Sequence, residues 1–397
     1  MWKNVTAAPP DSILGLTEAF RNDPNPEKVN LGVGVYMTDE GTVPILGCVT
    51  DAERILLGRE QSKGYLPIAG DPLFGTCVQK LIFGPGSEVI RSGRATTAHT
   101  PGGTGALRVG AELLKTFLPD ATVWLSTPTW ANHKGIFSAA GFPFQEYPYY
   151  NPETKGLKYD EMLERLKQIP AGDIVLFHAC CHNPSGVDLN GHQWQEVAEI
   201  ATEKGWIPFL DFAYQGFGSS IDEDRIAVET FARKGINFFV ASSFSKNLGL
   251  YSERAGAITL ISSGSEESAI AASHLKKTIR VCYSNPPAHG GLIAMTILSE
   301  PALEQAWRKE LTAICTRIIS MRNALVDRLD SHGIDQDFSF IRKQRGLFSF
   351  SGLSPETVSW LRNNKGIYVV EGGRINIAGL TTKNIDYVCD SIAEALK

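Results

Sequence analysis

The chain has 397 residues, of which 43% are hydrophobic and 20% are charged, and its formal net charge is −5. A chain of this length can bury a core without disulfides or metals, and its acidic balance argues against a nucleic-acid or anionic-membrane partner. We expect a cytoplasmic protein, because no apolar run approaches the ~20 residues of a membrane span, no secretion signal opens the chain and the seven cysteines form no paired pattern.

The middle of the chain alternates short apolar runs with amphipathic helical patterns. Strands are expected at 122–126, 174–179, 207–211, 238–243 and 256–261, and helices at 104–117, 159–168, 191–204 and 226–234. This alternation predicts an α/β fold with a mostly parallel sheet between helices. In such sheets, ligand-binding groups gather beyond the carboxyl ends of the strands.

The C-terminal part has a different pattern. One long helix is expected over 304–329, followed by strand patterns at 338–341, 347–350, 367–370 and 374–377, with helices at 355–363 and from residue 382. We interpret this part as a smaller α+β domain that the N-terminal segment around 13–36 completes.

Lys246 directly follows an expected strand, within Ser-Phe-Ser-Lys-Asn. Lysine forms Schiff bases with carbonyl cofactors, and burial lowers its pKa toward a useful value. Taken alone, a lysine at such a position is more often a solvated loop residue.

Asp211 and Tyr214 follow the strand expected at 207–211. A buried carboxylate needs a partner, which a pyridinium nitrogen would provide, and Tyr214 could donate to a phenolate oxygen. The alternative is a helix-capping aspartate and a core tyrosine.

Two further stretches suit a phosphorylated aromatic cofactor. Gly103 and Thr104 open a helical pattern without the lysine of a Walker motif, and the backbone amides at a helix start favour a phosphate. Trp130 offers a flat stacking surface after another strand, and His133 could form a hydrogen bond with Asp211. Each signal is weak alone, and a core tryptophan is the alternative.

A cluster of histidine and cysteine covers His178, Cys180, Cys181 and His182, just before Asn183. We expect no metal site here, because residues leaving a strand alternate faces and the spacing matches no usual zinc pattern. Asn183, in a turn with the following proline and glycine, is expected to face the cleft.

Three arginines are candidates for binding phosphate or carboxylate groups, because a guanidinium group binds both in a bidentate manner. They are Arg254, Arg280 and Arg374. Most arginines are surface residues, and for each of these three a surface position is the alternative.

Together and in this order, the motifs resemble one family. The series is Gly-Gly-Thr-Gly-Ala-Leu, Pro-Thr-Trp-x-Asn-His, His-Asn-Pro-Ser-Gly-Val-Asp, Asp-x-Ala-Tyr-Gln-Gly-Phe, Ser-Phe-Ser-Lys-Asn and Gly-Arg-Ile-Asn-Ile-Ala-Gly. It is similar to the aspartate/aromatic amino-acid aminotransferases, which are pyridoxal 5′-phosphate (PLP) enzymes of fold type I. The resemblance runs from about residue 13 to the C-terminus.

The resemblance implies a large PLP-binding domain with a seven-stranded, mostly parallel sheet at 44–313. It implies a small domain of 13–43 with 314–397, and an N-terminal arm at 1–12. It further implies a homodimer with shared active sites and cis peptide bonds before Pro128 and Pro184.

The resemblance also implies a role for each matching residue. Lys246 would hold the cofactor and shuttle the proton, Asp211 would pair with the ring nitrogen with support from His133, and Trp130 would stack on the ring. The 3′ oxygen would bond Tyr214 and Asn183. The phosphate ligands would be Gly103, Thr104, Ser243, Arg254 and Tyr65 of a second subunit. The substrate-binding residues would be Gly34, Trp130, Asn183, Arg374 for the α-carboxylate and Arg280 of the second subunit for a side-chain carboxylate.

The implied activity transfers the amino group of aspartate to 2-oxoglutarate by a ping-pong mechanism that alternates between PLP and pyridoxamine phosphate. Amino acids and 2-oxo acids are therefore the expected small-molecule partners. Arg280, Thr104 and Asn285 favour acidic substrates, whereas Met37, Val43 and Gly64 resemble the aromatic branch more closely. Phenylalanine or tyrosine transfer as the main activity is the first alternative. A lyase or decarboxylase on the same fold and a non-enzymatic binding protein are the others.

Overall fold

The computed structural model describes residues 2–7, 14–59 and 61–397. The chain divides into two compact units, one formed by Pro44–Thr316 and the other by Met1–Val43 together with Arg317–Lys397. Of the N-terminal arm expected at 1–12, residues 2–7 are described and begin with a short 3₁₀ helix, η1 (Trp2–Asn4), and the rest lies outside the described residues. Within the described residues, every helix is too short or too polar to traverse a lipid bilayer.

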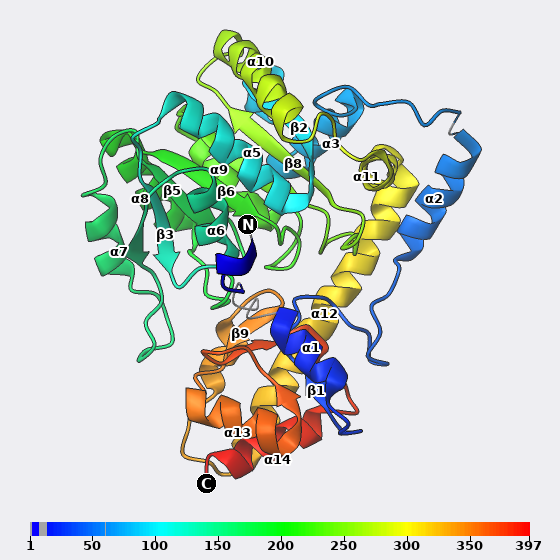
Figure 1. The fold of residues 1–397 in the computed structure, drawn as a ribbon, viewed down its shortest axis with the longest axis vertical. Coiled ribbons are helices and arrows are strands. Elements are labelled where there is room, and N and C mark those ends of the chain that lie inside the picture. The colour runs from blue at the N-terminus through cyan, green and yellow to red at the C-terminus, as the bar shows by residue number, and fades with distance from the viewer. Residues whose placement is uncertain (1, 8–13, 60) are drawn as a thin grey trace. The chain divides into compact units, whose positions relative to one another are not determined.

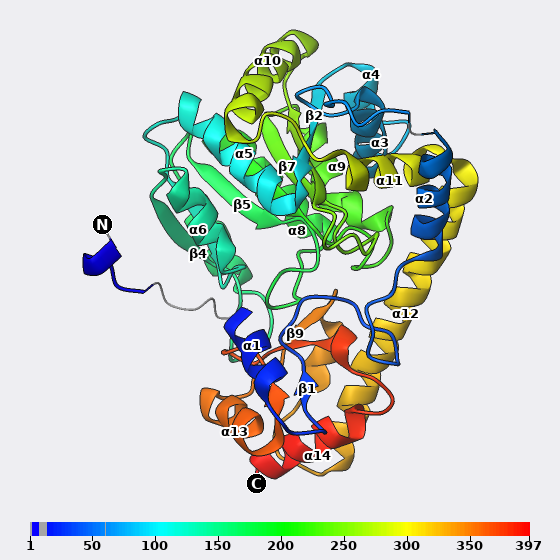
Figure 2. The same cartoon turned by 45° about the vertical axis from the view of Figure 1, so that its right-hand side comes forward.

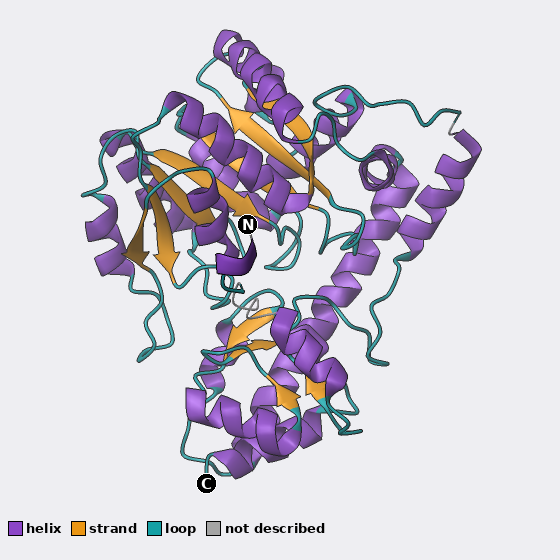
Figure 3. Cartoon of the chain, viewed as in Figure 1, coloured by secondary structure: helices purple, strands orange, loops and turns teal. Residues whose placement is uncertain are grey.

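The unit Pro44–Thr316 is built on a seven-stranded sheet (Figures 1 and 3). Its strands are β2 (Ala95–Pro101), β3 (Val123–Thr127), β4 (Phe144–Pro148), β5 (Ile174–His178), β6 (Ile207–Phe212), β7 (Phe238–Ser243) and β8 (Ala255–Ile261). The order is β2-β8-β7-β6-β5-β3-β4, and β8 is antiparallel to both of its neighbours while the other pairs are parallel. The expectation of a mostly parallel, seven-stranded sheet is confirmed.

The pattern of apolar residues in the sequence did not predict the edge strands β2 and β4. Strand β2 reads Ala-Thr-Thr-Ala-His-Thr-Pro, and the first three residues of β4, Phe144 to Glu146, are exposed. An edge strand is buried on fewer sides than a central strand, so it carries little of the apolar run that identifies a buried strand.

Helices precede and follow the strands and cover the sheet on both faces (Figure 2). They are α2 (Gly47–Arg59), α3 (Pro72–Phe83), α4 (Glu88–Arg91), α5 (Gly102–Phe117), α6 (Asn132–Ala139), α7 (Tyr159–Leu166), α8 (Gly191–Lys204), η2 (Glu223–Arg225), α9 (Ile226–Arg233), α10 (Ser265–Cys282) and α11 (Ala288–Ser299). The ends of α8 illustrate how the sequence sets the bounds. Asn190 and Gln193 form a capping box at its start, and Gly205 ends it in a left-handed conformation.

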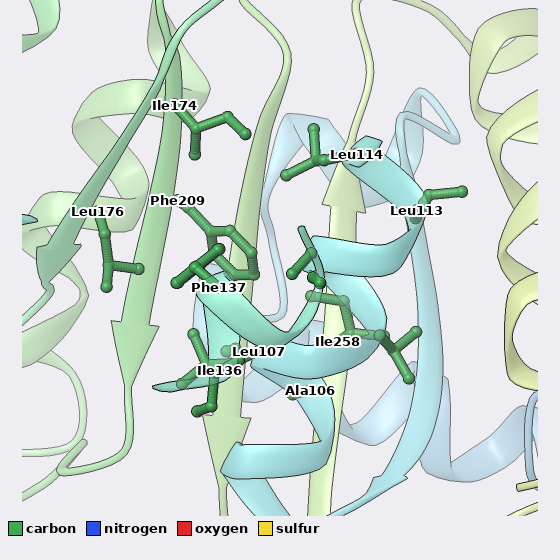
Figure 4. Packing of buried hydrophobic residues seen from close by; sticks show 14 of the residues in the cluster. Ala106, Leu107, Leu113, Leu114, Ile136, Phe137, Ile174, Leu176, Phe209 and Ile258 are labelled. Atoms are coloured by element: carbon green, nitrogen blue, oxygen red, sulfur yellow. The ribbon is translucent and has the colours of Figure 1, made fainter. Parts of the chain in front are cut away.

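The alternation along β5 explains why two layers of helices are needed. Leu176 lies in the apolar cluster that α5 and α6 form on one face (Figure 4). Its neighbour Phe177 meets the rings of Trp194 in α8 and Phe231 in α9, at centroid distances of 5.7 and 6.4 Å. Successive residues of a strand point to opposite faces, so a central strand that is apolar throughout requires a helical layer on each side.

The second unit combines short elements from both ends of the chain. They are α1 (Leu14–Asn22), β1 (Val29–Asn30), η3 (Ser339–Lys343), β9 (Phe348–Phe350), α13 (Pro355–Lys365), β10 (Ile367–Tyr368), β11 (Arg374–Asn376), η4 (Ile377–Gly379) and α14 (Ile385–Ala395). Helix α12 (Pro301–Ser331) contributes residues to both units. Strand β1 pairs in parallel with β10, and β9 pairs antiparallel with β11. The N-terminal segment therefore contributes a strand to this unit.

One of the strand predictions in this unit was wrong. Residues 338–341 fall mostly in the 3₁₀ helix η3, in which Ile341 is fully buried while Ser339 is exposed. A run of four residues with three apolar side chains fits one turn of helix as well as it fits a strand, so periodicity alone could not separate the two.

Candidate active site

The predicted site residues of the unit Pro44–Thr316 come from loops at one edge of the sheet. His178, the last residue of β5, is in register with Asp211 of β6, which in turn is in register with Ala241 of β7. Parallel strands end at a common edge, so the loops after them meet there. Because β8 is antiparallel, it begins at this same edge, where Ala255 lies opposite Pro101 at the end of β2. Arg254 therefore joins the other loops.

Asp211 and His133 form the buried centre of the site. The Nε2 atom of His133 lies 3.1 Å from a carboxylate oxygen of Asp211, and its Nδ1 atom lies 2.8 Å from the hydroxyl of Thr129. His133 is fully buried and Asp211 is 6% exposed. Burial by itself would raise the pKa of Asp211, but the hydrogen bond with His133 and the charges of His133 and Lys246 together lower it below its ordinary value. The carboxylate is therefore ionised in its buried position.

Lys246 lies in the turn after β7, close to both Asp211 and Tyr214. Its amine is 5.4 Å from the centre of the Tyr214 ring. Burial lowers the pKa of Lys246, the charge of Asp211 opposes this effect, and the charge of Arg254 adds to it. A lysine with a lowered pKa holds more of its amine in the neutral, nucleophilic form at neutral pH.

The start of α5 lies against Ser243 and Arg254. A Cβ atom added to Gly102, whose φ is +71°, would lie 2.4 Å from the Arg254 guanidinium, and one added to Gly103 would lie 3.2 Å from the Cβ of Ser243. In the part of the chain that the structure describes, no side chain at the N-cap position accepts from the first amides of α5, which continue through Thr104. The amides at a helix start and a guanidinium are both donors for an anion, so this corner of the site is suited to a phosphate group.

Trp130 and Asn183 lie on the loops after β3 and β5. The ring of Trp130 meets that of His133 edge to face at a centroid distance of 5.2 Å, and Asn183 is 6% exposed. The peptide bonds before Pro128 and Pro184 are both cis, as expected. These two residues, with Lys246, Asp211, His133 and Tyr214, make one constellation at the sheet edge.

The sequence analysis did not assign roles to His178 and His182, which lie behind Asp211. The rings of His133 and His178 are 5.1 Å apart, and those of His178 and His182 are 4.4 Å apart. The two histidines of this His-Cys stretch therefore have neighbouring rings, which the sequence analysis did not anticipate. The missing signal was the register of β5 with β6, which places His178 beside Asp211.

Three of these groups lie close enough to share a metal ion. Ligand atoms of His133, His178 and Asp211 lie within 4.8 Å of one another, and all three residues are buried. The Nε2 atom of His178 has no hydrogen-bond partner among the described residues. Burial lowers the pKa of His178 to about 3, with the charge of His133 adding to the effect and that of Asp211 opposing it. His178 is therefore a neutral neighbour of the Asp211 carboxylate at physiological pH.

Two predicted site residues in this unit lie apart in exposed positions. Tyr65 is 94% exposed, and Arg280, near the end of α10, is exposed with a hydrogen bond to Ser284. Both were expected to act in the site of a second subunit.

The other unit holds Gly34 and Arg374. Arg374 in β11 is 5% exposed, donates to the carbonyl of Gly32 at 2.7 Å and lies 4.2 Å from the centre of the Phe348 ring. A Cβ atom added to Gly34 would lie 2.9 Å from the Cζ atom of Phe348. Arg374 and Gly34 therefore flank the same aromatic ring.

Comparisons with known proteins agree with this geometry. The chain is 49% identical to the aspartate aminotransferase of Escherichia coli (strain K12) over 396 residues, which is 100% of both chains. It is 39% identical to the tyrosine aminotransferase of Klebsiella pneumoniae, also over the full length of both. Its fold matches the crystal structure of the aromatic-amino-acid aminotransferase from Burkholderia pseudomallei, covalently bound to pyridoxal phosphate, with a TM-score of 0.98, 49% identity and 100% coverage of both chains.

A family model described as "Aminotransferase class I and II" matches residues 26–392. This match spans nearly the whole chain, including the sheet edge with Lys246 and the strand with Arg374. The protein therefore belongs to the class I and II aminotransferase family.

Proposed function

We propose that this protein is a PLP-dependent aminotransferase that transfers the amino group of aspartate to 2-oxoglutarate, with some turnover of phenylalanine or tyrosine. The observation that carries the proposal is the group of Lys246 and the buried Asp211 and Tyr214 at the carboxyl edge of the sheet. A nucleophilic lysine beside an ionised, buried carboxylate is the pair that a pyridine-based aldehyde cofactor requires.

The residues present fit this cofactor at both of its ends. The start of α5 with Gly103, Thr104, Ser243 and Arg254 would bind the phosphate, because uncapped helix amides and a guanidinium converge there. Asp211, supported by His133, would pair with a protonated ring nitrogen. Trp130 would stack on the ring, and Tyr214 and Asn183 would bond its 3′ oxygen.

When bound, PLP supplies an electron sink that weakens the Cα–H bond of an amino acid. The chain's own residues then have three tasks. Asp211 would stabilise positive charge at the ring nitrogen. The Lys246 amine, whose pKa burial lowers, takes the proton from Cα and returns it at a second position. Arg374 would hold the α-carboxylate through its guanidinium.

Aspartate is proposed as the main substrate on two grounds. Arg280 would provide a second guanidinium for a side-chain carboxylate, and the full-length relatives at 47–49% identity carry the name aspartate aminotransferase. The tyrosine aminotransferase that matches over the full length is less similar, at 39%. A two-substrate cycle through one carboxylate clamp gives ping-pong kinetics, since the first product leaves before the second substrate binds.

We further propose that the protein is a cytoplasmic homodimer. Large apolar side chains of the unit Pro44–Thr316 are exposed, among them Ile45 (74%), Leu57 (84%) and Val281 (82%), near the exposed site residues Tyr65 and Arg280 in sequence. Exposed apolar surface of this kind is typical of a subunit interface. A second copy would cover it and receive Tyr65 and Arg280 in its own site. The two compact units would be the large, cofactor-binding domain and the small domain.

The test is a steady-state comparison of aspartate, tyrosine and phenylalanine, each with 2-oxoglutarate, on enzyme reconstituted with PLP. We expect kcat/KM to be highest for aspartate, and parallel double-reciprocal lines. A higher value for tyrosine or phenylalanine would instead support an aromatic aminotransferase. Protein that takes up no PLP would contradict the proposal as a whole.

A further inference from the structure

Asn376 lies two residues after Arg374 in β11, and its side chain is fully buried. Its Nδ2 atom donates to the carbonyl of Val33 at 2.6 Å and to the carbonyl of Val35 at 2.8 Å. These two carbonyls belong to the residues on either side of Gly34. One amide therefore holds the backbone on both sides of a proposed substrate-binding residue.

The remaining hydrogen-bonding groups of Asn376 fix the amide in this orientation. Its Oδ1 atom accepts from the backbone N–H of Ala378 at 3.0 Å, and its own N–H donates to the carbonyl of Leu31 at 2.8 Å. A primary amide has two N–H donors, and each of them here faces a different carbonyl. A rotated amide would place its oxygen against two buried acceptors, so a single orientation is strongly favoured.

Arg374 and Phe348 complete the support around Gly34. Arg374 donates to the carbonyl of Gly32, so the carbonyls of residues 32, 33 and 35 all accept from side chains of β11. The ring of Phe348 lies under the Arg374 guanidinium and leaves no room for a side chain at Gly34. The backbone of residues 32–35 is thus attached directly to the strand that carries the proposed carboxylate clamp.

We propose that Asn376 is a positioning residue for substrate binding: it fixes the backbone on both sides of Gly34 beside Arg374, so that the two residues hold the α-carboxylate together. This inference rests on the proposed roles of Gly34 and Arg374. Asn376 itself has no part in the proton transfer, because both of its donors are engaged by the backbone. Its removal loosens the carboxylate site and leaves Lys246 and Asp211 unchanged.

The effect of Asn376 is general to all substrates. Every amino acid and every 2-oxo acid carries the carboxylate that Arg374 and Gly34 would hold, whereas only the dicarboxylates need Arg280. Loss of the Asn376 amide therefore raises KM for aspartate and for phenylalanine by a similar factor. Interactions made equally in the ground state and the transition state appear in KM rather than in kcat.

Two substitutions separate the donors of Asn376 from its acceptor. Asn376→Ala removes the whole amide, and Asn376→Asp retains an oxygen for the N–H of Ala378 but removes both donors to Val33 and Val35. Asn384 is the matched control. It lies in the same unit, and its side chain accepts from the N–H of Thr381 and donates to the carbonyl of Gly379 rather than to residues 32–35.

The experiment measures KM and kcat for aspartate and for phenylalanine, the dissociation constant of succinate and the thermal unfolding midpoint for Asn376→Ala, Asn376→Asp and Asn384→Ala. We expect both Asn376 variants to raise KM for both amino acids and the succinate dissociation constant by about tenfold or more, with kcat within about threefold. Asn384→Ala is expected to leave these constants unchanged. Unchanged KM values in folded Asn376 variants, or an equal effect in Asn384→Ala, would overturn the inference.

Amide hydrogen exchange on the unaltered holoenzyme provides a second measurement that does not depend on the folding of a variant. We expect slow exchange in residues 33–35, and slower exchange when succinate is bound. Rapid exchange that succinate leaves unchanged would overturn the inference. A wild-type enzyme without transamination would contradict the proposed function itself, and this result differs from an active wild-type enzyme whose Asn376 variants keep their KM values.

Discussion

At the scale of single residues, the site depends on charges that are buried close together. Asp211 and Lys246 are both largely shielded from water, and each affects the pKa of the other. A buried charge is tolerated only when partners compensate for its lost hydration. His133 provides such a partner for Asp211 through a hydrogen bond of 3.1 Å.

Replacing Asp211 with asparagine tests this charge while preserving the size of the side chain. Because the pKa of Asp211 is lowered, the carboxylate is ionised at every pH at which the enzyme is assayed. We expect Asp211→Asn to lower kcat by at least about a hundredfold across the whole pH range, because asparagine lacks the negative charge that would pair with the ring nitrogen of PLP. A loss confined to one limb of the pH profile would contradict this reading.

The lowered pKa of Asp211 also predicts how the stability of the folded protein depends on pH. A carboxylate whose pKa is lower in the folded state stabilises the fold above its ordinary pKa, and this contribution is lost as pH falls through the lowered value. The stability advantage of the wild-type enzyme over Asp211→Asn should therefore shrink in acid. Urea unfolding of both proteins at neutral and acidic pH measures this difference.

Arg280→Ala tests the basis of substrate choice. Its guanidinium is exposed in a single chain and would bind the side-chain carboxylate of aspartate in a dimer. We expect kcat/KM for aspartate to fall by about a hundredfold or more, which is typical of a lost charge-assisted pair, with little change for phenylalanine. An equal loss for both substrates would assign Arg280 a structural role instead.

At the scale of elements, the packing of α5 on the sheet determines where the start of this helix lies, and this helix start is the proposed phosphate site. Gly110 in the middle of α5 faces β6, and an added Cβ atom would lie 2.6 Å from the Cζ atom of Phe209. Figure 4 shows Phe209 among the side chains that α5 covers. The helix can approach the strand only because this position has no side chain.

Gly110→Ala is expected to destabilise the protein, although alanine is the better helix former. The gain in helix propensity is about 1 kcal/mol, whereas forcing a methyl group into a packed core costs about 1–3 kcal/mol. Gly135 in α6 is the control, because it is exposed and its added Cβ would meet only ordinary contacts. Urea midpoints should fall for Gly110→Ala and stay equal or rise for Gly135→Ala.

The central elements were predictable because their patterns are local. Strand β5 is buried throughout and β6 and β7 are buried at all but one position each, so their apolar runs and the helices between them indicate an α/β sheet. Strand β2 and the η3 segment were not identified correctly because one is rich in threonine and the other is too short for a period to be recognised. Neither error affected the residues of the site.

At the scale of the whole molecule, the proposed dimer can be tested by mixing two inactive subunits. If each site combines its own Lys246 with Arg280 of the second copy, then Lys246→Ala and Arg280→Ala complement each other. In a mixed dimer one site lacks both residues and the other has both. Equal mixing with random exchange should restore about a quarter of the wild-type activity toward aspartate.

Sedimentation of each variant provides the control, because both should remain dimers. Mixed subunits that exchange but regain no activity would place Lys246 and Arg280 of one site on the same chain. A monomeric wild-type protein would remove the explanation offered for the exposed Tyr65 and Arg280.

The sequence by itself determined the fold class and the candidate site residues, because the motifs are short, contiguous and placed at the ends of apolar strands. Tertiary structure alone decided which of them meet. The register of β5 with β6 brings His178 beside Asp211, and the antiparallel course of β8 brings Arg254 to the start of α5. Asn376 holds residues more than 300 positions earlier in the chain. Local patterns cannot contain such contacts, because they depend on strand order and packing between distant segments.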